Sequence, residues 1–127
     1  MFAKTEAREP ARQESSEDVL LDLASRLEPD GGMPGRTASE RAARTIAAVL
    51  AFVEQGHTPT AGAFRSHVAR LVAFLVSIHG ISPREQALVD AAIQAASAGC
   101  APPGDWLALA RLTDVPWSKL EAPLRLS

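Results

Sequence analysis

The sequence has little of what would cross-link a chain, hold it in a membrane or draw it to nucleic acid. Its single cysteine, Cys100, excludes a framework of internal disulfide bonds. It contains no run of about 18 or more apolar residues, the length that a membrane-spanning helix needs. The formal net charge is only −2, so the whole chain sets up no field that would concentrate nucleic acid or anionic lipid. We therefore expect a cytoplasmic protein without a membrane span, whose partner is another protein.

The N-terminal segment, residues 1–15, is polar, mixed in charge and interrupted by Pro10. It has no apolar stretch of the kind found in secretory signals. Burial of so few apolar side chains cannot offset the entropy lost on ordering. We expect residues 1–15 to be a flexible, disordered leader or an interdomain linker. The 127-residue chain, 46% hydrophobic, then supplies one core, and we expect residues 16–127 to form a single domain.

Apolar residues recur at helical spacing along this domain, whereas alternating runs of strand length are absent. Several start and stop signals divide the pattern. Ser15 and Thr37 are expected to cap the first two long helices, and Ser82-Pro83 with Glu85 forms a complete capping box. Gly56, Gly80 and Gly99 stand where helices should end. The sequence predicts an all-α, compact bundle of four to five antiparallel helices.

Two helix boundaries are less sharply marked. The helix that carries Phe64, Val68, Leu71 and Leu75 is expected to begin with Thr58 as its N-cap and Pro59 in its first turn, with Thr60 as the alternative cap. Beyond Asp105, we expect one or two helical turns, punctuated by Pro116 and Pro123 and packed on the end of the bundle.

The most distinctive stretch is the glycine-rich segment Pro-Asp-Gly-Gly-Met-Pro-Gly at residues 29–35. Glycines before a helix can cradle a phosphate, but this segment lacks the Gly-Lys-Ser/Thr ending and a preceding strand. Pro34 also removes one of the amides that would bind oxygen. A reversal of the chain between two helices explains these glycines better.

No set of residues specifies a reaction or a metal site. His67 and His79 are more than three helical turns apart, with no cysteine or carboxylate pair beside them. His57 and His79 lie next to the glycines that end two helices, and His67 adjoins the apolar stripe. Cys100 has no basic partner in its motif. We predict no catalytic residues, no cofactor and no metal, and therefore a protein that is not an enzyme.

A stripe of arginines leaves a second function open. Arg41, Arg44, Arg65 and Arg70 could form one basic surface on the two central helices. A small helical regulator that binds nucleic acid would use such a stripe, and it is the alternative to a protein-interaction module. We expect no nucleic acid as partner, because the net charge is negative and no recognition helix is evident.

Large side chains near the turn and the tail are the candidates for an interaction surface. We expect exposure and contacts at Met33, Arg36, Phe52, Phe74, Trp106 and Trp117. Phe52 and Phe74 lie off the main apolar stripes, so they either widen the core or form a second face through which the domain dimerises. Trp106 and Trp117 are expected to pin the C-terminal segment to the bundle.

Part of the chain resembles a known type of module. The residues concerned are Leu27-Glu28-Pro29-Asp30-Gly31-Gly32 in the turn, Thr45–Leu50 in one helix and Leu71–Leu75 in the next. This pattern is similar to the C-terminal helical module of proteins with a vault/inter-α-trypsin (VIT) domain followed by a von Willebrand factor A domain. The aromatic residue that often closes the family's turn is replaced here by Met33-Pro34.

The resemblance implies a bacterial multidomain scaffold whose small last module contacts other domains or proteins. This chain would then be the C-terminal domain of a larger protein. The metal of the A domain does not carry over, because the sequence has no Asp-x-Ser-x-Ser motif.

Overall fold

The computed structural model describes residues 15–126, which are helical apart from turns and loops. The leader expected over residues 1–15 lies outside the described residues except for Ser15. Within that range the helices are α2 (Ser16–Ser25), α3 (Ala38–Glu54), α4 (Arg65–Ser77), α5 (Pro83–Ala98), α6 (Trp106–Ala110) and α7 (Trp117–Leu126). The all-α, compact bundle is confirmed. Residues 15–126 form six helices where four to five were expected, because the tail forms α6 and α7.

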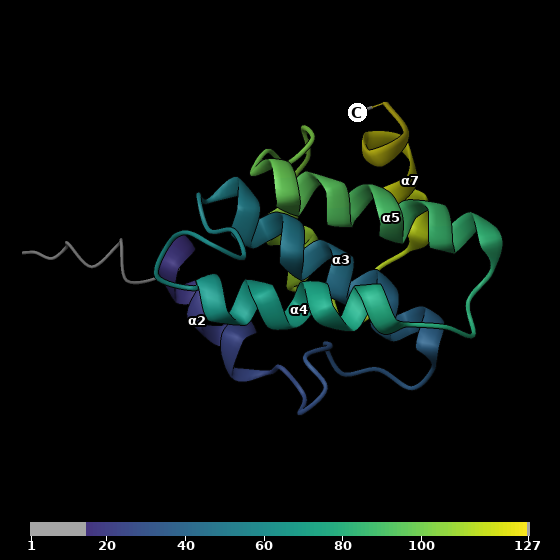
Figure 1. Cartoon of the computed structure of the whole chain (residues 1–127), viewed down its shortest axis with the longest axis horizontal. Coiled ribbons are helices and arrows are strands. Elements are labelled where there is room, and N and C mark those ends of the chain that lie inside the picture. The colour runs from purple at the N-terminus through teal and green to yellow at the C-terminus, as the bar shows by residue number, and fades with distance from the viewer. Residues whose placement is uncertain (1–14, 127) are drawn as a thin grey trace, which may run out of the picture.

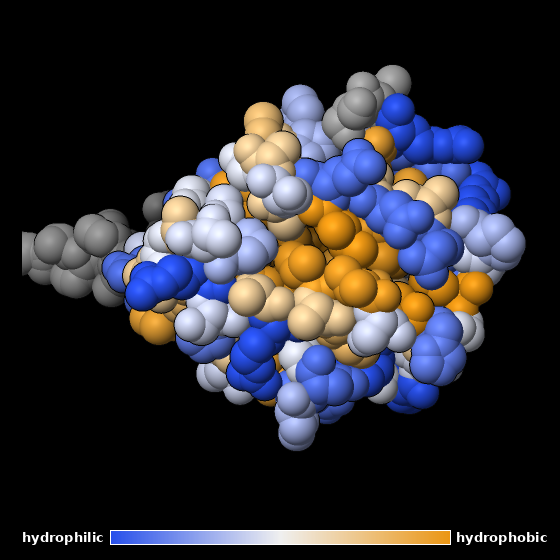
Figure 2. Space-filling model, viewed as in Figure 1, coloured by the Kyte–Doolittle hydropathy of each residue, from blue (hydrophilic) through white to orange (hydrophobic). Residues whose placement is uncertain are grey.

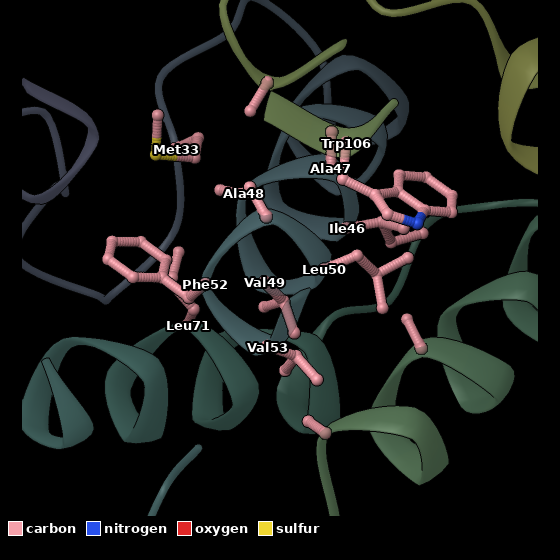
Figure 3. Close-up of a cluster of buried hydrophobic side chains, with 14 of the residues drawn as sticks. Met33, Ile46, Ala47, Ala48, Val49, Leu50, Phe52, Val53, Leu71 and Trp106 are labelled. Atoms are coloured by element: carbon pink, nitrogen blue, oxygen red, sulfur yellow. The ribbon is translucent and has the colours of Figure 1, made fainter. Parts of the chain in front are cut away.

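Helix α3 is the centre of the molecule. It is in contact with α2, α4, α5, α6 and α7, and Figure 1 shows it behind and between α4 and α5. Its side chains from Thr45 to Val53 are all buried. A helix that is apolar on every side must be enclosed by other elements. Figure 3 shows that the labelled side chains of α3 point in several directions around the helix. The core therefore surrounds α3 instead of lying along one of its faces.

Local capping signals fix most of the helix ends. The hydroxyl of Ser15 accepts a hydrogen bond from the amide of Asp18 at 3.1 Å, and Thr37 accepts one from Glu40 at 3.0 Å. Ser82 and Glu85 form the full reciprocal capping box at the start of α5. These three caps agree with the sequence because a cap depends only on residues within one turn.

The start of α4 differs from the prediction. The helix begins at Arg65 after an N-cap, Phe64, that makes no side-chain capping bond. Thr58 and Ala61 instead close a tight turn, in which the Thr58 amide donates to the Ala61 carbonyl at 2.9 Å. Gly62 then takes a φ of 92°, which no right-handed helix contains. Neither Thr58 nor Thr60 caps α4.

The C-terminal segment also departs from the prediction in one respect. Helix α7 begins at Trp117, directly after Pro116, but it continues through Pro123. Proline in a helix interior removes one backbone hydrogen bond. Leu120 and Leu124, one turn apart on either side of Pro123, are both buried in the core, and this burial favours continuation of the helix.

Candidate functional site

Four of the six residues expected on an interaction surface are buried. Met33, Phe52 and Trp106 are fully buried, and Phe74 is nearly so. Exposure was therefore wrongly predicted for these four side chains, and none of them can form a surface for a partner. Dimerisation through Phe52 and Phe74 loses its basis for the same reason.

Each burial has a physical cause. Phe52 lies on the enclosed helix α3, with its ring centroid 5.2 Å from that of Phe64. Trp106 is inserted beside α3, and its indole N–H donates to the carbonyl of Pro102 at 2.7 Å. Met33 enters the core from the loop before α3, as Figure 3 shows. Phe74 is covered by the guanidinium of Arg41, 4.6 Å from the ring centroid.

The other two candidates remain at the surface. Arg36 has a side chain that is 91% exposed, with Glu40 at 3.7 Å. Trp117 is half-buried, and its indole N–H donates to Ser39 Oγ at 2.9 Å, while Ser39 donates to Glu85 at 3.0 Å. This chain of bonds joins α7 to α3 and α5. Both tryptophans therefore attach the C-terminal segment to the bundle, as the sequence predicted.

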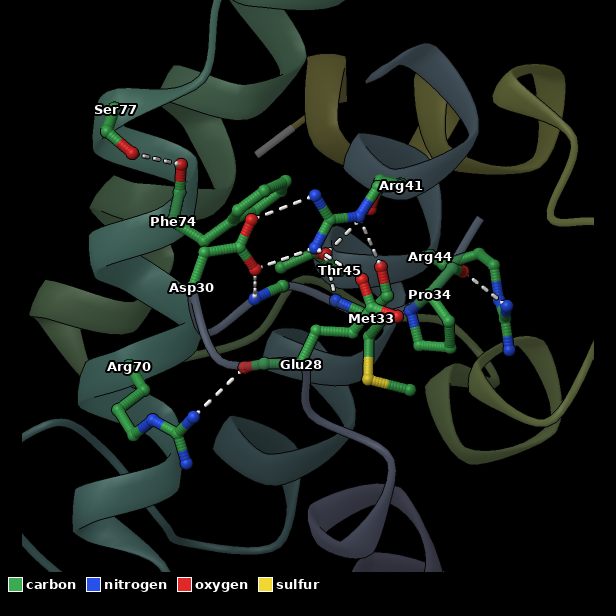
Figure 4. A network of polar contacts seen from close by, with 11 residues as sticks. Glu28, Asp30, Met33, Pro34, Arg41, Arg44, Thr45, Arg70, Phe74 and Ser77 are labelled. Atoms are coloured by element: carbon green, nitrogen blue, oxygen red, sulfur yellow. Dashed lines mark hydrogen bonds and ion pairs between the residues drawn. The ribbon is translucent and has the colours of Figure 1, made fainter. Parts of the chain in front are cut away.

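The glycine-rich turn forms a loop that is held by a polar network. We call residues 28–34 the 28–34 loop. Asp30 accepts two hydrogen bonds from Arg41, at 2.7 and 2.9 Å, and a third from the amide of Gly32 at 3.1 Å. Arg41 Nε donates to the carbonyl of Met33 at 3.0 Å, and the Met33 amide donates to Thr45 Oγ1 at 3.0 Å. Figure 4 shows how these bonds converge on Arg41.

Two further arginines hold the same loop. Arg44 donates to the carbonyl of Pro34, and Arg70 of α4 donates to the carbonyl of Glu28 at 3.0 Å. Both bonds are drawn in Figure 4. A carbonyl oxygen is a natural acceptor for a guanidinium fork. The start of the loop is thus attached to α4 and its end is attached to α3.

Close backbone approach explains the paired glycines. A Cβ atom on Gly31 would lie 2.3 Å from the carbonyl oxygen of Arg70, and Gly31 has a φ of 92°. A Cβ on Gly32 would lie 2.7 Å from the Phe74 ring. The loop packs against α4 only because both positions lack a side chain. The interpretation as a chain reversal agrees with this geometry.

The network shifts the pKa values of its ionisable groups. The hydrogen bonds from Arg41, and then the Gly32 amide, lower the pKa of Asp30 from 3.8 to about 2. The bond to Asp30 raises the pKa of Arg41, with burial acting in the opposite direction. The Asp30 carboxylate is consequently a weak base at neutral pH.

The arginine stripe is largely engaged within the domain. Arg41, only 20% exposed, also has Glu28 at 3.1 Å. Arg44 and Arg70 hold the 28–34 loop, and Arg65 donates to the carbonyl of Gly62 at 3.1 Å. Only Arg41 is paired with carboxylates, whereas the carbonyl acceptors fix the side chains of the other three arginines and leave their charge in place.

The histidines do not converge on one site. His57 and His67 both pack against the Phe64 ring, at centroid distances of 5.0 and 5.8 Å. His79 borders a separate pocket of about 260 Å³ with Asp30 and Arg41. Among residues 15–126, no group of three or more His, Cys, Asp and Glu side chains is placed to hold a metal ion. Cys100 is exposed.

The surface over α4 and α5 carries a feature that the sequence interpretation missed. Val76 is 67% exposed, the highest value among the exposed large hydrophobic residues of the described chain. One turn earlier on the same side of α4, Val72 lines a groove of about 300 Å³ together with Ile93 of α5. We call the surface formed by Val72, Val76 and Ile93 the α4–α5 face. Figure 2 shows apolar side chains gathered at the centre of this side of the molecule.

Two stretches of chain that contribute to the α4–α5 face contain no charged side chain. The sequence has no Asp, Glu, Lys or Arg between Arg70 and Arg84, and none between Asp90 and Asp105. These two stretches supply the second half of α4 and the second half of α5. The charge-free stretch, combined with a valine off the buried stripe, was the sequence signal that could have identified this face.

Comparisons of the chain with family models, with curated proteins and with solved structures found no match. Within residues 15–126, no helix combines the length and the apolar character needed to cross a membrane.

Proposed function

We propose that this domain is a non-catalytic protein-interaction or assembly module and that the α4–α5 face is its contact surface. The observation that carries the proposal is the coincidence of an exposed valine, an apolar groove and a local absence of charge. Depletion of charged residues at the centre of a patch is the compositional feature that distinguishes protein interfaces. Val76 and the groove beside Val72 and Ile93 have this composition.

The occupant that fits this face is the apolar side of a helix from a partner protein or another domain. A groove between two helices accepts side chains spaced three or four residues apart on an amphipathic helix. Its volume of about 300 Å³ accommodates a few aliphatic side chains. Its lack of charge favours an apolar surface over an acidic or basic segment.

The face rests on a rigid base. Both α4 and α5 pack on α3, and Leu71, Leu75 and Val89 fill the space beneath them without solvent exposure. A contact surface that needs no rearrangement binds without the entropic cost of ordering. This preformed geometry supports a role in stable contact with a protein partner.

The resemblance to the last helical module of VIT and von Willebrand factor A proteins gives the proposal a context. In that context the domain is bacterial and cytoplasmic, and its partner is another domain of the same scaffold. Sequencing the gene upstream of Met1 tests this context separately, because an A domain encoded there would support it and an unrelated sequence would contradict it.

Site-specific photo-cross-linking tests the proposed face. A photoreactive residue would be placed at Val76, at Ile93 and, as a matched control, at Leu21, an apolar residue of α2 that is 53% exposed. We expect covalent products with one protein from positions 76 and 93, and none from position 21. If the cross-linked product is instead a second copy of this chain, the partner at the α4–α5 face is the protein itself. Equal labelling from all three positions, or no products from positions 76 and 93, would contradict the proposal.

A further inference from the structure

The α4–α5 face has a charged side chain near each of its two ends, and the two charges are of opposite sign. Arg65 precedes Val72 by seven residues, about two helical turns, so it lies on the same side of α4. Asp90 precedes Ile93 by three residues, so the two are neighbours on the surface of α5. Both Arg65 and Asp90 are exposed.

The antiparallel course of the two helices separates these charges. Figure 1 shows that α4 and α5 run in opposite directions, and Val72 and Ile93 line the same groove. Asp90 is therefore level with Val76 at one end of the face, whereas Arg65 lies at the other end. At the rise of an α-helix, the two charges are about 15 Å apart along the groove.

Neither charge is neutralised within the domain. Among residues 15–126, Arg65 and Asp90 form no ion pair: Arg65 donates to the carbonyl of Gly62 at 3.1 Å, and Asp90 accepts a hydrogen bond from the side-chain amide of Gln86 at 3.1 Å. Both acceptor and donor are uncharged, so the full charge remains at each end of the face.

The other arginines of these helices make contacts outside the α4–α5 face. Arg70 donates to the carbonyl of Glu28 in the 28–34 loop, and Arg84 pairs with Glu121 of α7 at 2.6 Å. The face therefore presents an apolar middle, one positive end and one negative end.

We propose that the partner of the α4–α5 face is the same face of a second copy of this chain. This inference rests on the proposed contact role of the face. A two-fold axis that crosses the middle of the groove, perpendicular to α4, exchanges the two ends of the face. Arg65 of each copy then approaches Asp90 of the other, and the apolar middle of one copy covers that of the other. Opposite charges thus meet at both ends, which makes the face complementary to itself.

The exposed side of α4 permits this close contact. Ala69, Ala73 and Val76 are all exposed and follow the i, i+4, i+7 spacing of one helical face. Helices α4 and α5 of the two copies would form a four-helix layer of the kind found in bundles. An unrelated helix would have to supply an apolar stripe and a matching charge at each end, whereas a second copy contains both.

The test is sedimentation equilibrium of the purified full chain with reversed charges. We expect the parent to be a dimer in equilibrium with its monomer. Arg65→Glu and Asp90→Arg each place two like-charge pairs across the interface, so each variant alone should dimerise at least about tenfold more weakly. An equimolar mixture of the two variants should recover the dimer, because opposite charges then meet again at both ends. Arg36→Glu, a reversal at a side chain that is 91% exposed and outside the face, should dimerise as the parent does.

Three results would overturn the proposal. These are a parent that stays monomeric at about 0.5 mM, undiminished dimerisation of both folded variants, and a mixture that dimerises no better than its components. Recovery in the mixture also shows that both variants are folded. If a reversed variant does not fold, Arg65→Gln and Asp90→Asn replace the reversals, and each should weaken the dimer. A monomeric parent whose position 76 cross-links to a different protein would overturn the dimer but not the contact role of the face. The absence of any cross-link from that position would contradict both.

Discussion

At the scale of single residues, Leu71 and Val76 make a matched pair on α4. Leu71 is fully buried against the core and Val76 is 67% exposed. Leu71→Ala leaves a cavity, so we expect it to reduce the free energy of unfolding by about 2 to 5 kcal/mol. Val76→Ala should change it by less than about 0.5 kcal/mol. Urea denaturation of the two variants measures the difference, and equal midpoints would refute the assigned core.

A comparison of Gly31 with Gly56 separates the effect of steric contact on stability from the effect of backbone conformation. Both have a φ of 92°, but a Cβ on Gly31 would meet Arg70 at 2.3 Å, whereas one on Gly56 would meet nothing within 4 Å. We expect Gly56→Ala to cost about 1 to 2 kcal/mol through left-handed strain alone. Gly31→Ala should cost clearly more, because the 28–34 loop must also move away from α4. Thermal unfolding of both variants compares them, and equal losses would contradict the close packing of the loop.

Asp30 should make stability depend on pH. Its pKa is lowered from 3.8 to about 2 in the folded protein, so the folded state keeps the carboxylate charged where the unfolded state takes up a proton. The stabilisation is therefore present above about pH 4 and is lost as the pH falls towards 2. Because the carboxylate is half-exposed, solvent screening keeps the effect small. The free energy of unfolding of Asp30→Asn should fall less than that of the parent as the pH is lowered over this range. An identical dependence on pH in the two proteins would disprove the role of the Asp30–Arg41 pair.

At the scale of elements, the capping box of α5 provides the sharpest test. Ser82 accepts from the Glu85 amide at 3.1 Å, and its own amide donates back to Glu85 at 3.2 Å. We expect Ser82→Ala to destabilise the domain by about 1 kcal/mol and to speed amide hydrogen exchange in the first turn of α5. Ser97→Ala, at an exposed position near the end of the same helix, is the control and should do neither. Exchange rates that stay unchanged in both variants would argue against the cap.

Helix ends of this kind were predictable because their cause is local. Ser15, Thr37 and Ser82 each bond to an amide three residues on, a relation that the sequence alone contains. The start of α4 was not predictable in this way. Its position follows from the turn between Thr58 and Ala61 and from Gly62, which compete with the caps that Thr58 or Thr60 would have formed.

At the scale of the whole molecule, the enclosure of α3 decides which side chains reach the surface. The sequence between Ala42 and Val53 contains only two polar residues, Arg44 and Thr45, which is consistent with a helix covered on all sides. Interpreted as an amphipathic helix with one broad apolar face, the same residues left open whether Phe52 widens the core or forms an interface. How many helices cover α3 depends on contacts between residues distant in sequence, which periodicity does not encode.

The candidate site also combines features that the local sequence predicts with features that depend on tertiary contacts. The 28–34 loop was correctly interpreted as a reversal, but its attachment through Arg41 and Arg70 needs the relative placement of α3 and α4. Val76 was overlooked because an exposed valine is ordinary until its neighbours on α5 are known. Met33 and Trp106 were placed outside because turn and tail residues are usually exposed.

The central claim is that the α4–α5 face binds a protein partner, and one measurement tests it most directly. Size-exclusion chromatography of extracts of its native cells would compare the parent with Val76→Arg and with the control Leu21→Arg. Both positions are exposed, so we expect both variants to fold. A charge at the centre of an apolar contact removes the complex. We predict that the parent and Leu21→Arg elute in a larger complex and that Val76→Arg elutes as the free domain. Retention of the complex by Val76→Arg, or elution of the parent as the free domain, would contradict the account.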